Sequence, residues 1–216
     1  MQRIRIYYAK TQALRYTGNL DVHKIWERTL RRAKLPLAYS QGFHPQPKLN
    51  QACPLPLGML SRAEIIDIWL DPDLPLEHVA AQLAKNIQPG FEIDRLENVD
   101  LHEPALQTRV AAARFHVTLL TLPGENQLPL TEVWEKVTSL LAAESLPRER
   151  RDKPYDLRPF IQHLEIIGSD EKGQTVLSML LSATAGASGR PEEVLSAMGF
   201  DPLSARIERV ELVFLS

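Results

Sequence analysis

The N-terminal stretch RIRIYYAK (residues 3–10), followed by NLDVHKIWERTLRRA (residues 19–33), decides the fold expected for this chain. In the first segment Ile4, Ile6 and Tyr8 alternate with other residues, which is the period of a half-buried β-strand. In the second segment apolar residues recur at spacings of three and four, as on one face of an amphipathic helix. Asn19 stands where a helix N-cap is expected. The pattern therefore predicts a strand followed by a helix with a basic outer face.

The rest of the chain continues this alternation. Proline confines the segment 37–56 to an edge strand or a strand-like loop. The other expected elements of the first half are a strand at 64–70, a helix at 75–87 and a strand at 91–96. Those of the second half are strands at 114–120, 160–167, 175–181 and 207–215, and helices at 129–141 and 191–198.

Each half therefore has the order β-α-β-β-α-β, which is typical of a ferredoxin-like unit. We predict an α+β fold of two tandem ferredoxin-like units with antiparallel sheets, as domains at 1–100 and 108–216. One continuous α+β sheet is the alternative.

Positive charge is concentrated at the start of the chain. Residues 1–62 hold 11 Lys and Arg against two acidic residues, whereas the remainder holds 14 Lys and Arg against 25 acidic residues. The formal net charge of −2 thus hides a basic part of +9 and an acidic part of −11. Such asymmetry favours a polyanion-binding face, and RNA, of the transfer or ribosomal class, is the predicted partner.

Several classes of protein are disfavoured by composition. No apolar run is long enough to span a membrane, and the N-terminus lacks the apolar region of a secretory signal, so a cytoplasmic protein is expected. Cys53 is the single cysteine, which leaves no internal disulfide and no multi-cysteine metal or iron–sulfur site. No cofactor is predicted.

The densest polar constellation runs from Lys10 to Lys48. Gly42 permits a sharp turn, and Pro45 and Pro47 stiffen the chain after it. Basic groups, aromatic rings and a stiff loop are the ingredients of single-stranded RNA recognition. The predicted RNA-binding residues are Lys10, Arg15, Arg28, Arg31, Arg32, Tyr39, Gln41, Phe43, His44 and Lys48.

Each of these residues also has a plain structural interpretation. The arginines could form a solvated helix face, Tyr39 and Phe43 could be core or hinge residues, and His44 could be a turn residue without a role. A second charged segment, 147–158, carries both signs and could be an exposed loop or a second wall of one groove.

Catalytic motifs are missing from the sequence. It has no glycine-rich phosphate loop, no zinc-ligand cluster and no nucleophile elbow, so we expect no catalysis by this chain on its own. The alternative is a metal-free endoribonuclease that uses His44, His23, Tyr39 or Lys48 as acid or base. A protein–protein adaptor whose basic face meets an acidic partner is the third hypothesis.

The N-terminal residues closely resemble a known family, the radical-SAM-linked proteins. The resemblance is dense over about the first 70 residues and is supported later by Asp156-Leu157-Arg158-Pro159. In the family a Ser-His pair usually precedes the Leu-Asp of the first helix, whereas Gly18-Asn19 stands there in this chain. The matching residues of the first part are Arg3-Ile4-Arg5-Ile6, Lys10-Thr11, Leu14-Arg15-Tyr16, Leu20-Asp21, Glu27-Arg28, Leu30-Arg31-Arg32-Ala33, Leu35-Pro36, Tyr39-Ser40-Gln41-Gly42-Phe43, Pro45, Pro47-Lys48 and Pro54-Leu55-Pro56-Leu57-Gly58.

The resemblance implies an accessory role. Members are uncharacterised and are encoded beside a radical SAM protein or fused to its C-terminus. Radical SAM chemistry needs three cysteines on an iron–sulfur cluster, and this chain has only Cys53. The predicted function is therefore an RNA-binding protein that presents its RNA to a separate radical SAM modification enzyme. The order of elements is also similar to that of CRISPR repeat-processing endoribonucleases.

Overall fold

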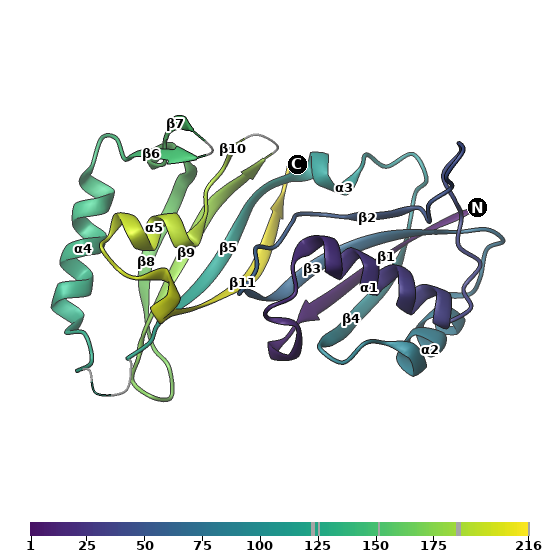
Figure 1. Cartoon of the computed structure of the whole chain (residues 1–216), viewed down its shortest axis with the longest axis horizontal. Coiled ribbons are helices and arrows are strands. Elements are labelled where there is room, and N and C mark those ends of the chain that lie inside the picture. Colours follow the sequence, from purple (N-terminus) through teal and green to yellow (C-terminus); the bar gives the residue numbers. More distant parts are fainter. Residues whose placement is uncertain (122–123, 125, 151, 185–186, 216) are drawn as a thin grey trace. The chain divides into compact units, whose positions relative to one another are not determined.

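A computed structural model describes residues 1–121, 124, 126–150, 152–184 and 187–215. The described residues form a mixed α+β protein with mostly antiparallel strands and five α-helices (Figure 1). Backbone contacts divide it into two compact units, Met1–Val110 and Ala111–Ser216. The sequence placed the division earlier, between residues 100 and 108.

The first unit has the expected order of elements. Its strands are β1 (Gln2–Lys10), β2 (Leu49–Gln51), β3 (Leu60–Leu70) and β4 (Phe91–Val99). They lie in the spatial order β2-β3-β1-β4, and every neighbouring pair is antiparallel. Its helices are α1 (Asn19–Arg32), α2 (Leu76–Asn86) and the short α3 (Leu106–Arg109), with a 3-10 turn at Gln12–Leu14.

The core of this unit follows from the two sequence periods. Alternation places Ile4, Ile6 and Tyr8 of β1 on the face that the helices cover, and all three are buried. Tyr8 packs edge-on against Trp26 of α1 and Phe91 of β4, with ring centroids 4.9 and 5.2 Å apart. The register pairs Ile4 with Ile68 and Ile6 with Ile66, so β3 extends the same apolar face.

Three local expectations need correction. Gly18, not Asn19, is the N-cap of α1, and it has no side chain to cap the helix. Of the segment 37–56, only Leu49–Gln51 joins the sheet as β2. The strand predicted at 64–70 begins four residues earlier because β3 runs from Leu60.

The second unit repeats the order with additions. Its strands include β5 (Val110–Leu119), β8 (Ile161–Ser169), β9 (Thr175–Thr184) and β11 (Ala205–Phe214), in the spatial order β8-β9-β5-β11. Its helices are α4 (Leu130–Ala142) and α5 (Pro191–Ala197). The additions are β10 (Ala187–Ser188), which pairs with β9, and a separate antiparallel pair, β6 (Pro147–Arg150) and β7 (Lys153–Asp156). This pair occupies the segment for which the sequence offered only a charged loop.

Candidate nucleic-acid interface

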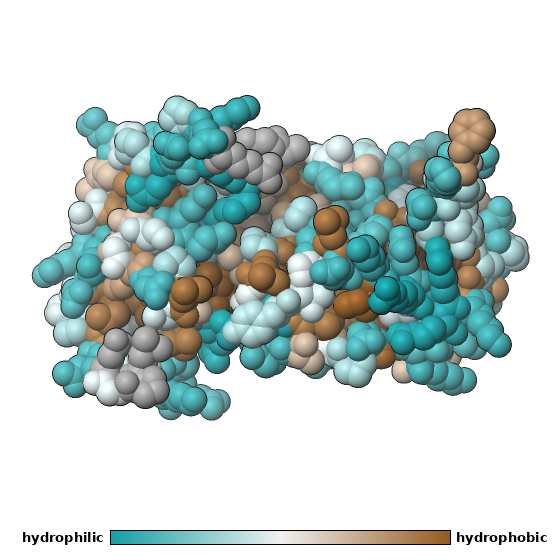
Figure 2. Space-filling view, viewed as in Figure 1, coloured by the Kyte–Doolittle hydropathy of each residue, from teal (hydrophilic) through white to brown (hydrophobic). Residues whose placement is uncertain are grey.

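The outer face of α1 carries an accessible cluster of cations. Helical periodicity buries Val22, Trp26 and Leu30, and it places Arg28, Arg31 and Arg32 together on the opposite side, where all three are exposed. Figure 2 shows hydrophilic side chains gathered over the C-terminal part of this helix. Cations in the last turn are also favoured by the helix dipole.

The way in which α1 ends adds a fourth cation. Lys34 adopts a left-handed conformation with φ of 53°, its N–H donates to the Arg31 carbonyl at 3.0 Å, and the Leu35 N–H donates to the Leu30 carbonyl at 3.3 Å. These two bonds form a Schellman motif, in which Leu30 and Leu35 are both buried. The motif fixes the direction of the chain as it leaves the helix and leaves Lys34 exposed.

We name Arg28, Arg31, Arg32 and Lys34 the α1 basic face. Among the described residues, Arg28, Arg31 and Lys34 have no carboxylate partner. Arg32 is partly engaged, because its guanidinium donates to the Asn86 carbonyl at 3.1 Å at the end of α2. The face therefore offers three uncommitted cations and one that also ties α1 to α2.

The chain next forms a projecting hairpin at residues 38–48, which we name the 38–48 hairpin. Its ends are closed by the Lys48 N–H, which donates to the Ala38 carbonyl at 2.8 Å, and by a bridge between Tyr39 and Pro47. The Ser40 N–H donates to the Gln46 carbonyl at 2.8 Å one step further out. Trp69 of β3 anchors the stem, since its carbonyl accepts from the Ala38 N–H at 2.8 Å.

The tip of the 38–48 hairpin holds three of the predicted site residues. Gly42 takes a φ of 131°, which glycine adopts readily, and the turn that it makes leaves Gln41, Phe43 and His44 exposed. Phe43 is fully exposed, at 102% of its reference area, and Tyr39 at the stem is 43% exposed. In Figure 2 an apolar side chain stands clear of the surface where Figure 1 draws this segment. The alternative that the two rings belong to the core is therefore wrong.

Two predicted cations point inward. Lys10 is buried, and its Nζ donates to the carbonyls of Met59 at 3.1 Å and Arg15 at 3.3 Å. The Arg15 Nε donates to the Gly58 carbonyl at 2.9 Å, and its guanidinium lies over the Tyr16 ring. These bonds join the turn after β1 to the loop before β3. Lys10 therefore serves the fold in this structure, and Arg15 is half-buried beside it.

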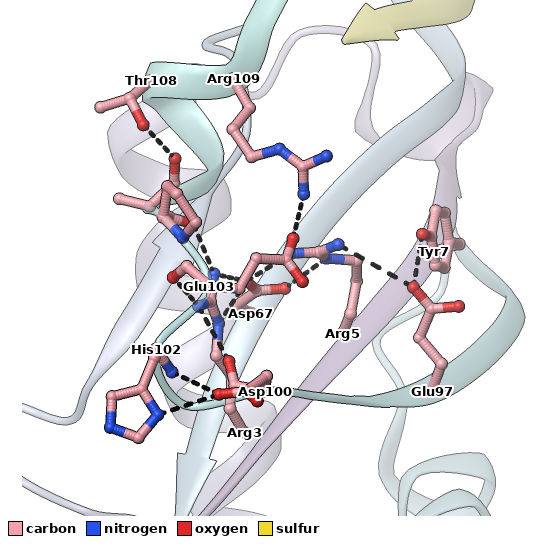
Figure 3. Close-up of polar contacts among 12 residues, drawn as sticks. Arg3, Arg5, Tyr7, Asp67, Glu97, Asp100, His102, Glu103, Thr108 and Arg109 are labelled. Carbon is pink, nitrogen blue, oxygen red and sulfur yellow. Dashed lines mark hydrogen bonds and ion pairs between the residues drawn. The ribbon is translucent and has the colours of Figure 1, made fainter. Parts of the chain in front are cut away.

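Arg3 and Arg5 of β1 are buried as well, on the face of the sheet away from α1 (Figure 3). Both guanidinium groups bond to Asp67 of β3, with Arg3 Nη2 at 2.5 Å and Arg5 Nε at 2.9 Å from its carboxylate oxygens. Glu103 accepts a further bond from Arg5 at 3.0 Å and one from Arg109. We name Arg3, Arg5, Asp67 and Glu103 the buried ion cluster.

The electrostatics of the buried ion cluster follow from these contacts. Burial alone would lower the pKa of Arg5, but hydrogen bonds and attraction from Asp67 and Glu103 raise it well above its ordinary value. Burial would raise the pKa of Glu103, but Arg5 and Arg109 together lower it below its usual range. Arg5 and Glu103 are thus held in their charged forms, and both arginines are already bonded to carboxylates within the protein.

The four residues named for acid–base catalysis all lie in the described chain and are not bonded to one another. Lys48 is half-buried, and His23 lies 3.5 Å from Glu27 along α1. Within the described part of the chain, no hydrogen bond or ion pair joins any two of His23, Tyr39, His44 and Lys48. The described residues also contain no group of three or more His, Cys, Asp or Glu side chains that could hold a metal ion.

Five residues of these clusters were not among the predicted site residues: Lys34 of the α1 basic face, and Arg3, Arg5, Asp67 and Glu103 of the buried ion cluster. The basic run itself was the signal for Lys34, but its exposure depends on the Schellman motif. Asp67 alternates correctly with buried isoleucines, so it could have been placed on the second face of β3. Nothing in the sequence indicated that residues 100–109 would cover that face.

The C-terminal end of the charged segment 147–158 in the second unit makes hydrogen bonds that stabilise the local fold. The Asp156 carboxylate accepts from the N–H groups of Leu146 at 2.7 Å and Arg158 at 2.9 Å, which lowers its pKa. The Arg158 guanidinium donates to the carbonyls of Leu141 at 3.0 Å and Ala143 at 3.2 Å, at the C-terminus of α4. Asp156-Leu157-Arg158-Pro159 thus closes the helix onto the hairpin that follows it.

Comparison with known proteins gives a family and only remote structural likenesses. None of the described helices has the length and apolar character needed to cross a bilayer, and no curated protein matches the chain. The archaeal box H/ACA sRNP Nop10-Cbf5 complex aligns with a TM-score of 0.46 and 10% identity, over 97% of this chain and 47% of that one. An H/ACA RNP bound to a substrate RNA containing 2'-deoxyuridine gives 0.42 and 7%, over 88% and 43%.

This chain therefore spans less than half the length of either of those structures. A family model matches residues 3–191, which is most of the sequence. The chain belongs to that family, described as "Uncharacterized protein conserved in bacteria (DUF2344)".

Proposed function

We propose that this protein binds RNA through the α1 basic face and the 38–48 hairpin, and presents that RNA to a separate radical SAM modification enzyme. The observation that carries the proposal is the fully exposed Phe43, held on a hydrogen-bonded hairpin directly after a helix with uncommitted cations. An aromatic ring in water beside a cationic face suits a ligand that has both unpaired bases and phosphates.

The spacing of the two features supports a shared ligand. Phe43 follows Lys34 by nine residues, so their Cα atoms are separated by at most about 32 Å. Successive phosphates of a nucleic-acid strand lie much closer together than this, so a single strand of several nucleotides can span the gap. Phosphates would pair with Arg28, Arg31 and Lys34, and an unpaired base would stack on Phe43 with Tyr39, Gln41 and His44 around it.

Two finer structural assignments belong to this proposal. We assign both units to the ferredoxin-like fold, because each combines the order β-α-β-β-α-β with the corresponding order of strands. We place the protein in the cytoplasm, where RNA substrates and a radical SAM partner would be found.

The link to a radical SAM enzyme is supported by the resemblance of the N-terminal residues to proteins encoded beside or fused to such enzymes. The chain carries one cysteine, so the three thiolates of that chemistry must come from the partner. This division of labour makes the protein a holder of substrate, and transfer or ribosomal RNA is the proposed class.

The test replaces Arg28, Arg31 and Arg32 together by glutamate and measures the affinity for labelled bulk transfer RNA and for a ribosomal RNA fragment by fluorescence anisotropy. We expect at least a hundredfold weaker binding at 100 mM salt. In the corresponding triple alanine variant, the slope of log K against log salt should become less steep by about 0.7–0.9 for each phosphate that the protein no longer neutralises. Far-UV circular dichroism should be unchanged, because the three side chains are exposed.

A matched control makes the same change of charge elsewhere. Lys85, Lys153 and Lys172 are exposed and have no ion-pair partner within the described residues, so their triple glutamate variant alters net charge equally. It should bind RNA within threefold of the parent protein. Equal losses in both variants, or no loss in the first, would reject the proposed interface.

A further inference from the structure

A groove runs along the first unit between α2 and β4, and β4 is the last strand in the spatial order β2-β3-β1-β4. It encloses about 700 Å³. Phe91, Ile93 and Leu96 of β4 form its apolar floor, and Figure 1 shows the helix lying beside this strand. The groove lies wholly within residues 76–96 and shares no residue with the proposed RNA interface.

The groove exists because α2 presents small side chains at this position. Val79 and Leu83 point into the core and are buried. Ala80 and Ala84, one turn apart, line the middle of the groove with small side chains, between Leu76 at one end and Ile87 at the other. The floor is consequently a partly open apolar strip, in which Ile93 and Leu96 are half-buried and Phe91 is buried.

The strand beside the groove has an open edge. β4 pairs with β1 along nearly its whole length and is the last strand in the spatial order, so its other edge has no strand partner among the described residues. The N–H and C=O groups on an open edge are a template for pairing with an added strand. An edge strand beside an apolar groove is the arrangement by which proteins bind extended peptides through strand addition.

Charge on the rim indicates which peptide would fit. Glu77 and Glu92 line the groove and have no cationic partner in the described chain. Asp94 pairs with Arg95 at 3.0 Å, and the Arg95 guanidinium lies 3.4 Å from the centre of the Tyr7 ring, so this cation is already engaged. The uncompensated charge of the rim is therefore negative.

The same charges disfavour pairing with a second copy of this chain. Two β4 edges placed together would bring Glu92, Asp94 and Glu97 of one copy against the same residues of the other. Like charges opposite each other in a sheet are destabilising.

We propose that this groove binds an extended, basic peptide segment of a separate protein as an added strand on β4. The peptide backbone would pair with the open edge, and alternate apolar side chains would enter the groove against Ala80 and Ala84. Lysine or arginine residues between them would meet Glu77 and Glu92. This inference is independent of RNA binding and gives the protein a second recognition surface.

The experiment pans a displayed library of random twelve-residue peptides against the full-length protein. Enriched peptides are then synthesised, and their binding is measured by anisotropy. We expect enriched sequences with alternating apolar residues and at least two basic residues. Hydrogen exchange should show that the bound peptide slows exchange of β4 amides. Failure to enrich any peptide, or protection that lies away from β4, would overturn the proposal.

Three variants locate the site. Ala84→Trp fills the groove from the exposed side of α2 and should weaken the enriched peptides at least tenfold. Ala81→Trp adds the same ring at an exposed position that does not line the groove, and should change binding less than twofold. Glu77→Lys with Glu92→Lys should turn the selection towards acidic peptides. Peptides that ignore Ala84→Trp, or that stay basic against the charge-reversed protein, would contradict the assignment.

Discussion

The arginines of β1 and those of α1 have opposite surroundings within one unit of this protein. Arg3 and Arg5 are buried among carboxylates, whereas Arg28 and Arg31 are exposed and have no such partner among the described residues. Both pairs contribute equally to the basic character of the first 62 residues. The net charge counted along a sequence therefore includes both buried cations that are paired with carboxylates and exposed cations that are not. Only the exposed kind can attract a phosphate.

The comparison also shows how each environment arises. A helix that packs by one face keeps the other face in water, so the solvent exposure of the α1 cations follows from their helical spacing alone. A strand has two faces, and the second is exposed only if nothing covers it. Here the backbone carbonyls of Glu103 and Pro104 lie 2.5 and 3.1 Å from the Arg3 guanidinium, so the turn after β4 closes over that face.

The largest expected effect comes from removing Asp67, the buried counterion of the β1 arginines. Asp67→Asn removes the carboxylate partner of the buried Arg3 and leaves Arg5 with Glu103 as its main counterion. We expect a loss of about 3–5 kcal/mol in the free energy of unfolding measured with urea. The matched control is Asp94→Asn, which removes the exposed partner of Arg95. That variant should lose less than about 1 kcal/mol. Equal losses would mean that burial of the ion cluster does not determine its contribution.

A second test examines the exposed side of the comparison. Phe43→Ala removes a ring that contacts water only, so stability should remain within about 0.5 kcal/mol of the parent value. Affinity for RNA with unpaired bases should fall by about 1–3 kcal/mol, because a stacking platform is lost. Anisotropy with a single-stranded oligonucleotide and with a blunt duplex of the same length measures the effect, which should be confined to the first probe.

Tyr16→Ala provides the control for that measurement. Tyr16 is also an exposed aromatic residue, but it precedes α1, whose 14 residues span about 20 Å before the α1 basic face ends. Its removal should leave RNA affinity unchanged. A loss equal to that of Phe43→Ala would place the interface elsewhere on this unit.

The pH dependence of stability sharpens the description of the buried ion cluster. Arg5 and Arg109 outweigh burial and lower the pKa of Glu103 in the folded protein, so its contribution is fully present above the unfolded value of about 4.3. The contribution is lost as pH falls through the folded value. Glu103→Gln should therefore reduce stability at pH 7, and the difference from the parent protein should shrink between pH 5 and pH 3.

Urea titrations at a series of pH values follow this difference. Glu92→Gln, at an exposed glutamate of β4 with no ion-pair partner in the described chain, is the control and should give a curve parallel to that of the parent. A difference between Glu103→Gln and the parent protein that stays constant down to pH 3 would show that the charge of Glu103 does not stabilise the fold.

The smallest expected effect separates structure from binding at a single position. Lys34 holds a left-handed conformation that glycine adopts without strain, so Lys34→Gly should raise stability by about 0.5–1 kcal/mol. The same change removes one cation from the α1 basic face and should weaken RNA binding by less than fivefold. Thermal unfolding measures the expected gain in stability, and anisotropy measures the expected loss of RNA affinity. A loss of stability would contradict the assigned Schellman motif.

The sequence predicted those parts of the fold that local period controls. The strand and helix that open the chain were found because Ile4, Ile6 and Tyr8 alternate and because Trp26 and Leu30 share one helical face. The 38–48 hairpin was anticipated only as a stiff segment, since its stem is held to the sheet by bonds to Trp69, which is distant in the sequence. The inward orientation of Lys10 depends in the same way on the carbonyl of Met59.

Interactions across the sheet set the limit of prediction for the candidate site. Arg28, Arg31 and Arg32 were placed on an exposed face from their spacing, and the structure places them there. Asp67, Glu103 and the groove between α2 and β4 arise from segments that meet only after folding. The periodicity of one segment does not show which other segments it will contact after folding.

The solvent-exposed ring of Phe43 has a calorimetric consequence. Water around an apolar surface raises the heat capacity, and withdrawing that surface from water lowers it. Any ligand that covers the hairpin tip should therefore bind with a negative heat-capacity change, to which this one phenyl group contributes. Titration calorimetry at several temperatures can report the engagement of the tip whichever chemical group of the ligand meets it.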